Sequence, residues 1–323
     1  MSPTETIAAP EPAGGPPRRL QASSKRYGER AIRWLLASCA VLSVLTTTAI
    51  IISLILPTIG FFGIVPFDEF IFGTDWTPQF EPPSFGVLGI VAGTLNVTLW
   101  AMLFAIPIGL ATAVYLSEYA SPRVRTTVKP VLEVLAGIPT VAIGLFAVSF
   151  ILPEIIAPLW PGDLLGGAVG KPFMALAASL GIALMIVPII ASLSDDAMRA
   201  VPRGLHEGAY ALGATKAKVA TRVIFPAALS GIVASVVLAT SRAVGETMIV
   251  VLAAGSTPNF TLNPVESVQV MTSYIATTAT GDISTGSLDY KSVFAVGSVL
   301  FAMTLVMNVI SIRLVRRYRE VYE

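Results

Sequence analysis

The chain has few of the residues that build metal centres, disulfides and nucleophilic sites. Among its 323 residues there is one cysteine, Cys39, and one histidine, His206. This excludes an internal disulfide, a zinc site and a Cys–His catalytic pair. No segment has the form Gly-x-x-x-x-Gly-Lys-Ser/Thr, so the phosphate-binding loop that would hold ATP is missing. We expect no cofactor and no catalytic residues in this chain, which is therefore not an enzyme by itself.

Charge is also scarce. Only 13% of the residues are charged, against about 25% in soluble domains, while 54% are hydrophobic and the mean hydropathy is +0.77. The net charge of +1 gives no sign of a nucleic-acid-binding surface. The composition therefore predicts a polytopic, all-α membrane protein.

A membrane-spanning helix needs about 20 mainly apolar residues, and six stretches of the chain qualify. We expect spans at residues 34–56, 88–117, 132–153, 173–193, 228–253 and 293–314. Prolines interrupt three of them, namely Pro107, Pro139 and Pro188, where we expect kinks. Small residues are dense in LAGIPTVAIG and AVGETM, which favours close helix packing.

The placement of lysine and arginine predicts the orientation of these spans. Eighteen of the 21 basic residues precede the first span, follow the last, or lie in the second and fourth connections. The opposite connections hold Lys171 and Lys291, and one basic residue, Arg242, falls within a span. By the positive-inside rule both termini are cytoplasmic. Arginines at the span ends are suited to anionic membrane lipid.

The chain outside the spans divides into tails and loops. Residues 1–30 are rich in Pro, Ala, Gly and charge, and we expect a disordered cytoplasmic tail. Residues 31–315 form the transmembrane domain and 316–323 a short cytoplasmic tail. The connections at 57–87 and 254–292 should be external, and each is long enough to form short helices or to contact a partner.

Arg242 is followed by Glu246 four residues later, a spacing that places both on one face of a continuous helix. Charged groups at membrane depth are costly and face a cavity or each other. Arginine carries a planar fork of donors that matches an oxyanion, and Ser241 and Thr247 add hydroxyls. Two alternatives follow: a transient anion site, or an ion pair that fixes helix packing.

The segment EGAYALGATKAKVATRVIFP, residues 207–226, is polar and basic and lies between two apolar runs. Its order of Glu207, Ala209, Gly213 and Pro226 resembles the EAA loop with which ABC-importer permeases contact their ATPase. Gly213 would permit a sharp turn at the end of a short helix. Gly208 departs from the alanine usual after the glutamate. The alternative is an ordinary amphipathic cytosolic loop.

Three other segments resemble the phosphate-specific ABC permeases of the PstC type. They are SEYASPRVRTTVKPVLEVLAGIPTVAIG from Ser117, SRAVGETMIVVLAAG from Ser241, and VLFAMTLVMNVISIRLV from Val299. The resemblance covers a core at residues 86–315, with the coupling loop at 195–226. It implies the type I ABC-importer permease fold with six transmembrane helices, in the inner membrane.

The resemblance also implies partners and sites. The partners would be a second permease subunit of the PstA type, an ATPase subunit dimer that binds ATP, and a periplasmic or surface phosphate-binding protein. The substrate path would involve Arg242, Glu246, Thr247, Ser241 and Thr140. Contact with the ATPase would involve Glu207, Gly208, Ala209, Ala211, Leu212 and Gly213. Alternatives are a permease for molybdate, tungstate or sulfate, or a membrane sensor or scaffold.

Overall fold

The computed structural model describes residues 27–159 and 171–317. Most of the tails expected at 1–30 and 316–323 lies outside the described residues, whereas 27–30 and 316–317 are helical. The chain separates into one unit of residues 1–51 and a second of residues 52–323. The first helix begins in the first unit and ends in the second, and the features below belong to the second.

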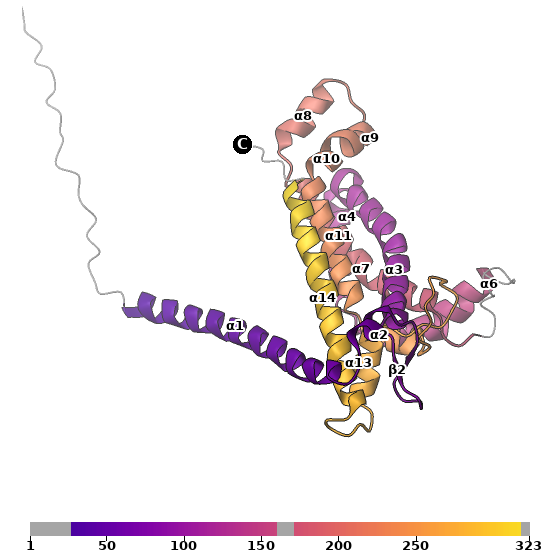
Figure 1. The fold of residues 1–323 in the computed structure, drawn as a ribbon. Coiled ribbons are helices and arrows are strands. Elements are labelled where there is room, and N and C mark those ends of the chain that lie inside the picture. Colours follow the sequence, from indigo (N-terminus) through magenta and orange to yellow (C-terminus); the bar gives the residue numbers. More distant parts are fainter. Residues whose placement is uncertain (1–26, 160–170, 318–323) are drawn as a thin grey trace, which may run out of the picture. The chain divides into compact units, whose positions relative to one another are not determined.

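Most of the described structure is helical (Figure 1). In the labels, η marks a π-helical segment. The elements are α1 (Tyr27–Phe62), α2 (Phe67–Phe72), β1 (Trp76–Thr77), β2 (Ser84–Phe85), α3 (Leu88–Val114), η1 (Tyr115–Tyr119), α4 (Pro122–Ala136), α5 (Thr140–Phe146), η2 (Ala147–Ile156), α6 (Ala157–Leu159), α7 (Ala175–Arg199), α8 (Arg203–Ala211), α9 (Lys216–Val219), η4 (Ala220–Ile224), α10 (Phe225–Ala227), α11 (Leu229–Val244), α12 (Met248–Ala253), α13 (Met271–Ala279) and α14 (Leu288–Arg317).

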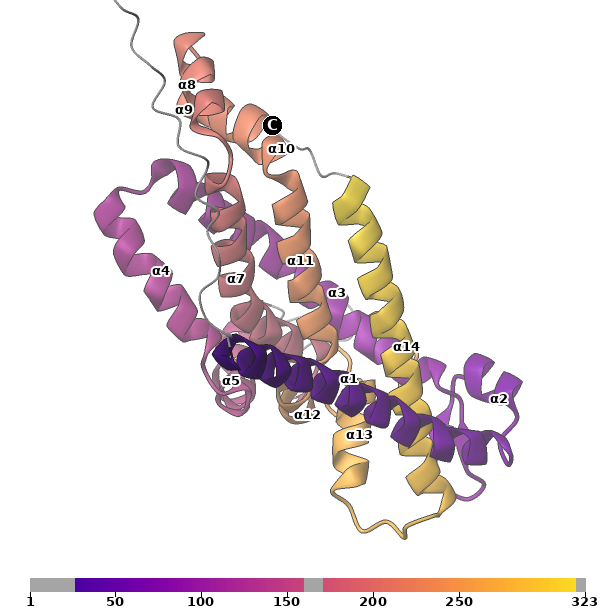
Figure 2. The same ribbon diagram turned by 90° about the vertical axis from the view of Figure 1, so that its left-hand side faces the viewer.

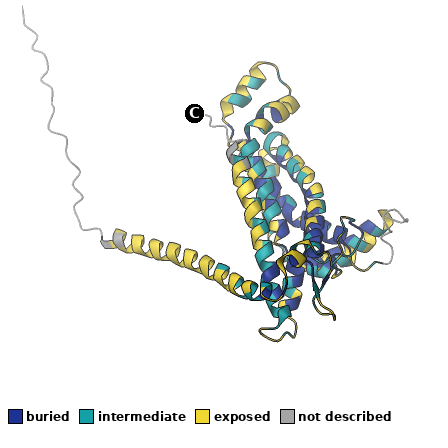
Figure 3. Ribbon diagram, in the orientation of Figure 1, coloured by how far each residue is buried: buried dark blue, intermediate teal, exposed yellow. Residues whose placement is uncertain are grey.

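Helix α7 is central to the second unit. It packs against α3, α11 and α4, and α11 in turn packs against α14 (Figures 1 and 2). Of its most apolar stretch, 67% is buried, against 39% for α3 and 17% for α14. The colouring in Figure 3 shows the same gradient, from buried α7 to the exposed face of α14. The central core therefore lies around α7.

Two smaller cores lie at opposite ends of this unit. At one end, Phe61, Phe70 and Phe85 pack edge to face, with ring centroids 5.3–5.4 Å apart. Trp76 and Tyr274 join this cluster, which supports α2, the antiparallel β1–β2 pair and α13. The expectation of short helices in connections 57–87 and 254–292 is thus confirmed. The other end carries α8, α9 and α10, whose core is described below.

Five described helices are long and apolar enough to cross a membrane, or six when one bent pair counts as a single span. They confirm the spans expected at 34–56, 88–117, 173–193 and 293–314, with ends that differ from the expected ones by at most six residues. Pro107 lies inside α3 and Pro188 inside α7, as expected.

The third expected span, 132–153, begins too early. Residues 132–136 close α4, an amphipathic helix that starts with Pro122 and whose N-cap Ser121 accepts a hydrogen bond from the Val124 amide. Proline disfavours helical geometry in the residue before it, so α4 ends ahead of Ile138 and Pro139. Pro139 is the N-cap of α5 rather than a kink. The apolar span is Thr140–Leu159.

The fifth expected span, 228–253, is broken. Helix α11 ends at Val244 with Gly245 as its C-cap, and α12 starts at Met248. The pair of helical segments that is long and apolar enough to count as one span is instead Lys216–Ala227 and Leu229–Val244, which meet at a 73° bend. Glycine favours helix ends, and the apolar run alone did not reveal this break.

Close packing at small residues is confirmed in the central core. A Cβ atom on Gly144 of α5 would lie 3.2 Å from the Cα atom of Ile249 in α12. Such a distance is tighter than ordinary van der Waals contact, so only glycine allows α5 and α12 to approach this closely.

Candidate functional site

Helix α8 carries most of the segment that the sequence singles out. Glu207, Gly208 and Ala211 are exposed on it, and Leu212, the C-cap, is 90% exposed. Ala209 is half-buried and packs against the core below. One face of the segment thus packs against the rest of the unit, and the other, wider face is exposed.

The end of α8 is a Schellman motif. Gly213 has a φ of +76°, its amide donates to the Tyr210 carbonyl, and the Ala214 amide donates to the Ala209 carbonyl. These are the two bonds of the motif, with Gly213 in the left-handed position that other residues rarely adopt. The sharp turn expected at Gly213 is confirmed.

A small core of its own supports α8. Its buried members include Met198, Val201, Val219 and Ile224. Leu205, Ala209 and Ala214 pack against this core from α8 and the following turn. Helix α8 is therefore attached firmly to the ends of α7 and α11.

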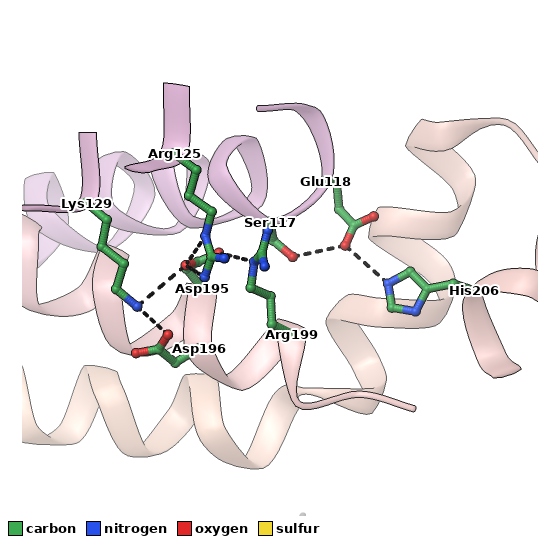
Figure 4. Close-up of polar contacts among 8 residues, drawn as sticks. All are labelled: Ser117, Glu118, Arg125, Lys129, Asp195, Asp196, Arg199 and His206. Atoms are coloured by element: carbon green, nitrogen blue, oxygen red, sulfur yellow. Dashed lines mark hydrogen bonds and ion pairs between the residues drawn. The ribbon is translucent and has the colours of Figure 1, made fainter. Parts of the chain in front are cut away.

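A polar contact also joins α8 to the end of the α3–η1 helix. His206 Nε2 lies 3.4 Å from Glu118 Oε1, and Ser117 Oγ donates to the same oxygen at 3.0 Å (Figure 4). The Glu118 side chain is 6% exposed. No role for His206 follows from the sequence, because nothing in the sequence places it beside residue 118.

A second polar cluster joins α4 to the end of α7. The buried Asp195 carboxylate accepts hydrogen bonds from Arg125 Nε at 3.2 Å and Nη2 at 2.8 Å. Lys129 pairs with Asp196 and lies 3.9 Å from Asp195, and Arg199 Nε lies 3.4 Å from Asp195 Oδ1 (Figure 4). The sequence predicts a cytoplasmic position for these basic residues, but nothing in it points to the acidic pair at the end of an apolar run as their partners.

Four of the five residues expected on the substrate path lie at the break between α11 and α12, namely Ser241, Arg242, Glu246 and Thr247. Arg242 is exposed in the last turn of α11, and its Nη2 lies 3.5 Å from Met185 Sδ. Ser241 Oγ donates to Asn308 Oδ1 of α14 at 3.0 Å. Thr247 is half-buried at the start of α12. Thr140 is half-buried at the start of α5, and no described hydrogen bond joins it to the other four.

The expectation that Arg242 and Glu246 share a helix face is wrong, because the helix ends between them. Glu246 is buried and accepts the amides of Met248 and Ile249, at 3.1 and 3.3 Å, at the start of α12. Among the described residues no ion pair joins it to Arg242. Its carboxylate therefore serves to cap a helix, which satisfies amides that would otherwise be unpaired.

Comparison with known proteins identifies the family. Residues 105–320 match the family described as binding-protein-dependent transport system inner membrane component. The probable ABC transporter permease protein YqgH of Bacillus subtilis (strain 168) is 32% identical over 88% of this chain and 88% of its own length. The phosphate transport system permease protein PstC of Pasteurella multocida (strain Pm70) is 31% identical over 94% of this chain and 98% of its own.

Solved structures support the same fold. A chain of a bacterial alginate ABC transporter, crystallised in complex with an alginate pentasaccharide-bound periplasmic protein, matches with a TM-score of 0.62. It is 18% identical, and the match covers 91% of this chain and 98% of that one. At this identity the likeness shows the fold alone, which is that of a type I ABC-importer permease. The chain is thus a multi-pass inner-membrane protein, and it belongs to the binding-protein-dependent transport system inner membrane components, among the PstC-type permeases.

Proposed function

We propose that this chain is the transmembrane subunit of an ATP-driven importer that moves inorganic phosphate across the inner membrane. The observation that carries the proposal is α8 with its Schellman turn. It is a short helix with a largely exposed face, mounted on its own core at one end of the helical unit. Relatives over most of its length are named phosphate transport permeases, which supports phosphate as the substrate.

The exposed face of α8 is the proposed contact with the ATPase. Leu212 is an apolar side chain with almost no cover from this chain, and a partner groove would remove it from water. The exposed residues beside it are Glu207, Gly208, Ala211 and Gly213. Ala209 would not contact the ATPase directly, because it packs against the core and so holds α8 in place. ATP would bind to the partner subunit, and movement of α8 would pass to α7 and α11 through this core.

Arg242 is the proposed anion contact on the translocation path. Among the described residues its only polar partner is the thioether of Met185, a weak acceptor. Its other donors are open to a passing oxyanion. Ser241 and Thr247 add hydroxyls at the α11–α12 break, and Thr140 would add one from the start of α5. Glu246 accepts amides at the start of α12 and so stabilises the break.

The remaining partners follow from this assignment. A second permease subunit of the PstA type would complete the path, an ATPase dimer would contact α8, and a periplasmic or surface phosphate-binding protein would deliver the substrate. The α8 end would face the cytoplasm, in agreement with the basic residues near it. The α13 end, with the β1–β2 pair, would face outward.

Uptake in whole cells tests the proposed function. A strain that lacks this chain should lose high-affinity uptake of radiolabelled phosphate, and the intact gene should restore it. A strain with an inactive partner ATPase should show the same defect. Undiminished phosphate uptake with loss of molybdate or sulfate uptake would reassign the substrate. Normal transport of all these anions in both strains would favour a sensor or scaffold.

A further inference from the structure

A pocket of about 470 Å³ lies between α4 and the end of α7, away from the proposed translocation path. Arg125 and Lys129 of α4 and Arg199 of α7 line it. Glu133, one helical turn after Lys129, lines it as well. The ion cluster of Figure 4 therefore forms one wall of an open pocket and is more than a contact between two helices.

The arginines in this wall retain unused donors. Arg125 donates hydrogen bonds from Nε and Nη2 to Asp195, and Arg199 Nε forms an ion pair with the same carboxylate. Within residues 27–159 and 171–317, no other ion pair or hydrogen bond uses Arg125 Nη1 or the two terminal nitrogens of Arg199. An arginine fork with free donors matches the oxygens of a phosphate group.

The charges in the wall do not cancel. Three cationic side chains meet the carboxylates of Asp195 and Asp196. Asp195 is fully buried behind the cations, whereas Asp196 is 54% exposed. One positive charge of this cluster is therefore in excess. Glu133, which lines the same pocket on α4, offsets that charge and brings the sum over the six groups to zero, so its carboxylate should weaken the binding of an anion.

The pocket lies at the end of two apolar spans, which is the level expected for lipid headgroups. It is next to the ends of two candidate spans, Leu88–Tyr119 and Ala175–Arg199, and polar headgroups flank the hydrocarbon core at that depth. The same helix α4 exposes Val131, Val134 and Leu135. An amphipathic helix that places basic side chains beside apolar ones is suited to the interface of a bilayer with anionic lipid.

We propose that this pocket binds a phosphate group, supplied either by a phospholipid headgroup or by inorganic phosphate. Arg199 and the free nitrogen of Arg125 contact the phosphate oxygens, Lys129 adds charge, and Glu133 limits the affinity. The site is separate from Arg242 and does not depend on what the chain transports.

Native mass spectrometry of the purified full-length chain tests this site. Phosphatidylglycerol is titrated into the wild type, Arg199→Gln, Glu133→Gln and the control Arg123→Gln, an exposed arginine of α4 that does not line the pocket. Arg199→Gln should weaken binding of the tightest lipid by about fivefold, the usual effect of one basic residue at a membrane surface. Glu133→Gln should tighten it, and Arg123→Gln should leave it unchanged.

A second titration uses radiolabelled inorganic phosphate in lipid-free detergent and distinguishes the two sources. Since Arg242 is intact in all the variants, a loss of bound phosphate in Arg199→Gln reports on this pocket. Such a loss, with unchanged lipid binding, assigns the pocket to inorganic phosphate. Equal binding of both ligands by the wild type and Arg199→Gln overturns the proposal. So does weaker binding of both by Glu133→Gln, a variant that leaves the Asp195 contacts in place.

Discussion

At the residue scale, Arg242 has two alternative roles, and the structure changes the balance between them. The ion pair with Glu246 required a continuous helix, but Gly245 ends α11 and Glu246 caps α12. Arg242 is left with a thioether neighbour and exposed donors. This arrangement favours a role toward an anion over a role in helix packing.

Substitutions of Arg242 separate charge from geometry. Arg242→Lys keeps the positive charge but loses the planar fork, so phosphate uptake should fall several-fold. Arg242→Gln loses both, and uptake should be nearly abolished. The measurement is the initial rate of labelled phosphate uptake at matched membrane expression of each variant.

The double variant Arg242→Gln, Glu246→Gln provides the control. If the two residues formed a structural ion pair, removal of both charges would restore transport. Because Glu246 instead accepts amides at the start of α12, the double variant should transport no better than Arg242→Gln. Recovery of uptake in the double variant would contradict the anion role of Arg242.

At the element scale, the attachment of α4 to α7 depends on one buried carboxylate. Asp195→Asn leaves Arg125 and Lys129 without their buried partner, and loss of one member of a buried pair costs about 3–5 kcal/mol. Because those cations are partly exposed, the lower end of this range is expected. Asp196→Asn, at an exposed neighbour, should cost about 0–1 kcal/mol. Thermal unfolding in detergent measures the loss of stability in both variants. Equal unfolding midpoints for Asp195→Asn and Asp196→Asn would contradict the role of Asp195 in attaching α4 to α7.

Helix α8 depends on the left-handed Gly213. A β-branched side chain is strained at a φ of +76°, so Gly213→Val should distort the turn that positions Leu212. We expect membrane insertion to remain normal and phosphate uptake to fall several-fold, because the proposed ATPase contact shifts. Gly204→Val on the same helix is the matched control, since a Cβ atom added to Gly204 would meet no other part of the protein within 4 Å and Gly204 lies outside the proposed contact. Full uptake by Gly213→Val would exclude a docking role for this turn.

At the scale of the whole molecule, the sequence predicted most of the spans but few of the contacts between them. Long apolar runs identify α3, α7 and α14, even where a proline lies inside the helix, because a bilayer requires length and apolarity from each span separately. The breaks at Pro139 and Gly245 depend on local capping, which hydropathy averages over. The contact of Arg125 with Asp195 joins positions that are 70 residues apart in the chain. A single sequence gives no information on how close such positions come in the fold. The left-handed Gly213 was predictable because its turn is local.

The orientation of the whole molecule is a separate prediction. Thr215 lies between α8 and α9, Ser284 lies between α13 and α14, and both are exposed. In Figure 1, α8 and α9 lie at one end of the second unit and the connection between α13 and α14 lies at the other. In a Cys39→Ser background, a cysteine at Ser284 should react with an impermeant thiol reagent in sealed cells. A cysteine at Thr215 should react only after permeabilisation. The reverse pattern would contradict the positive-inside assignment.

The proposal that this chain forms part of an ATP-driven phosphate importer can be tested in a reconstituted system. Uptake of labelled phosphate is measured in proteoliposomes that contain this chain, its partner permease and the ATPase, with the phosphate-binding protein added outside. We expect uptake that requires ATP inside and the binding protein outside, and that excess sulfate or molybdate does not inhibit. Phosphate accumulation without ATP, or ATP-driven accumulation of another oxyanion in its place, would show that the chain has a different function.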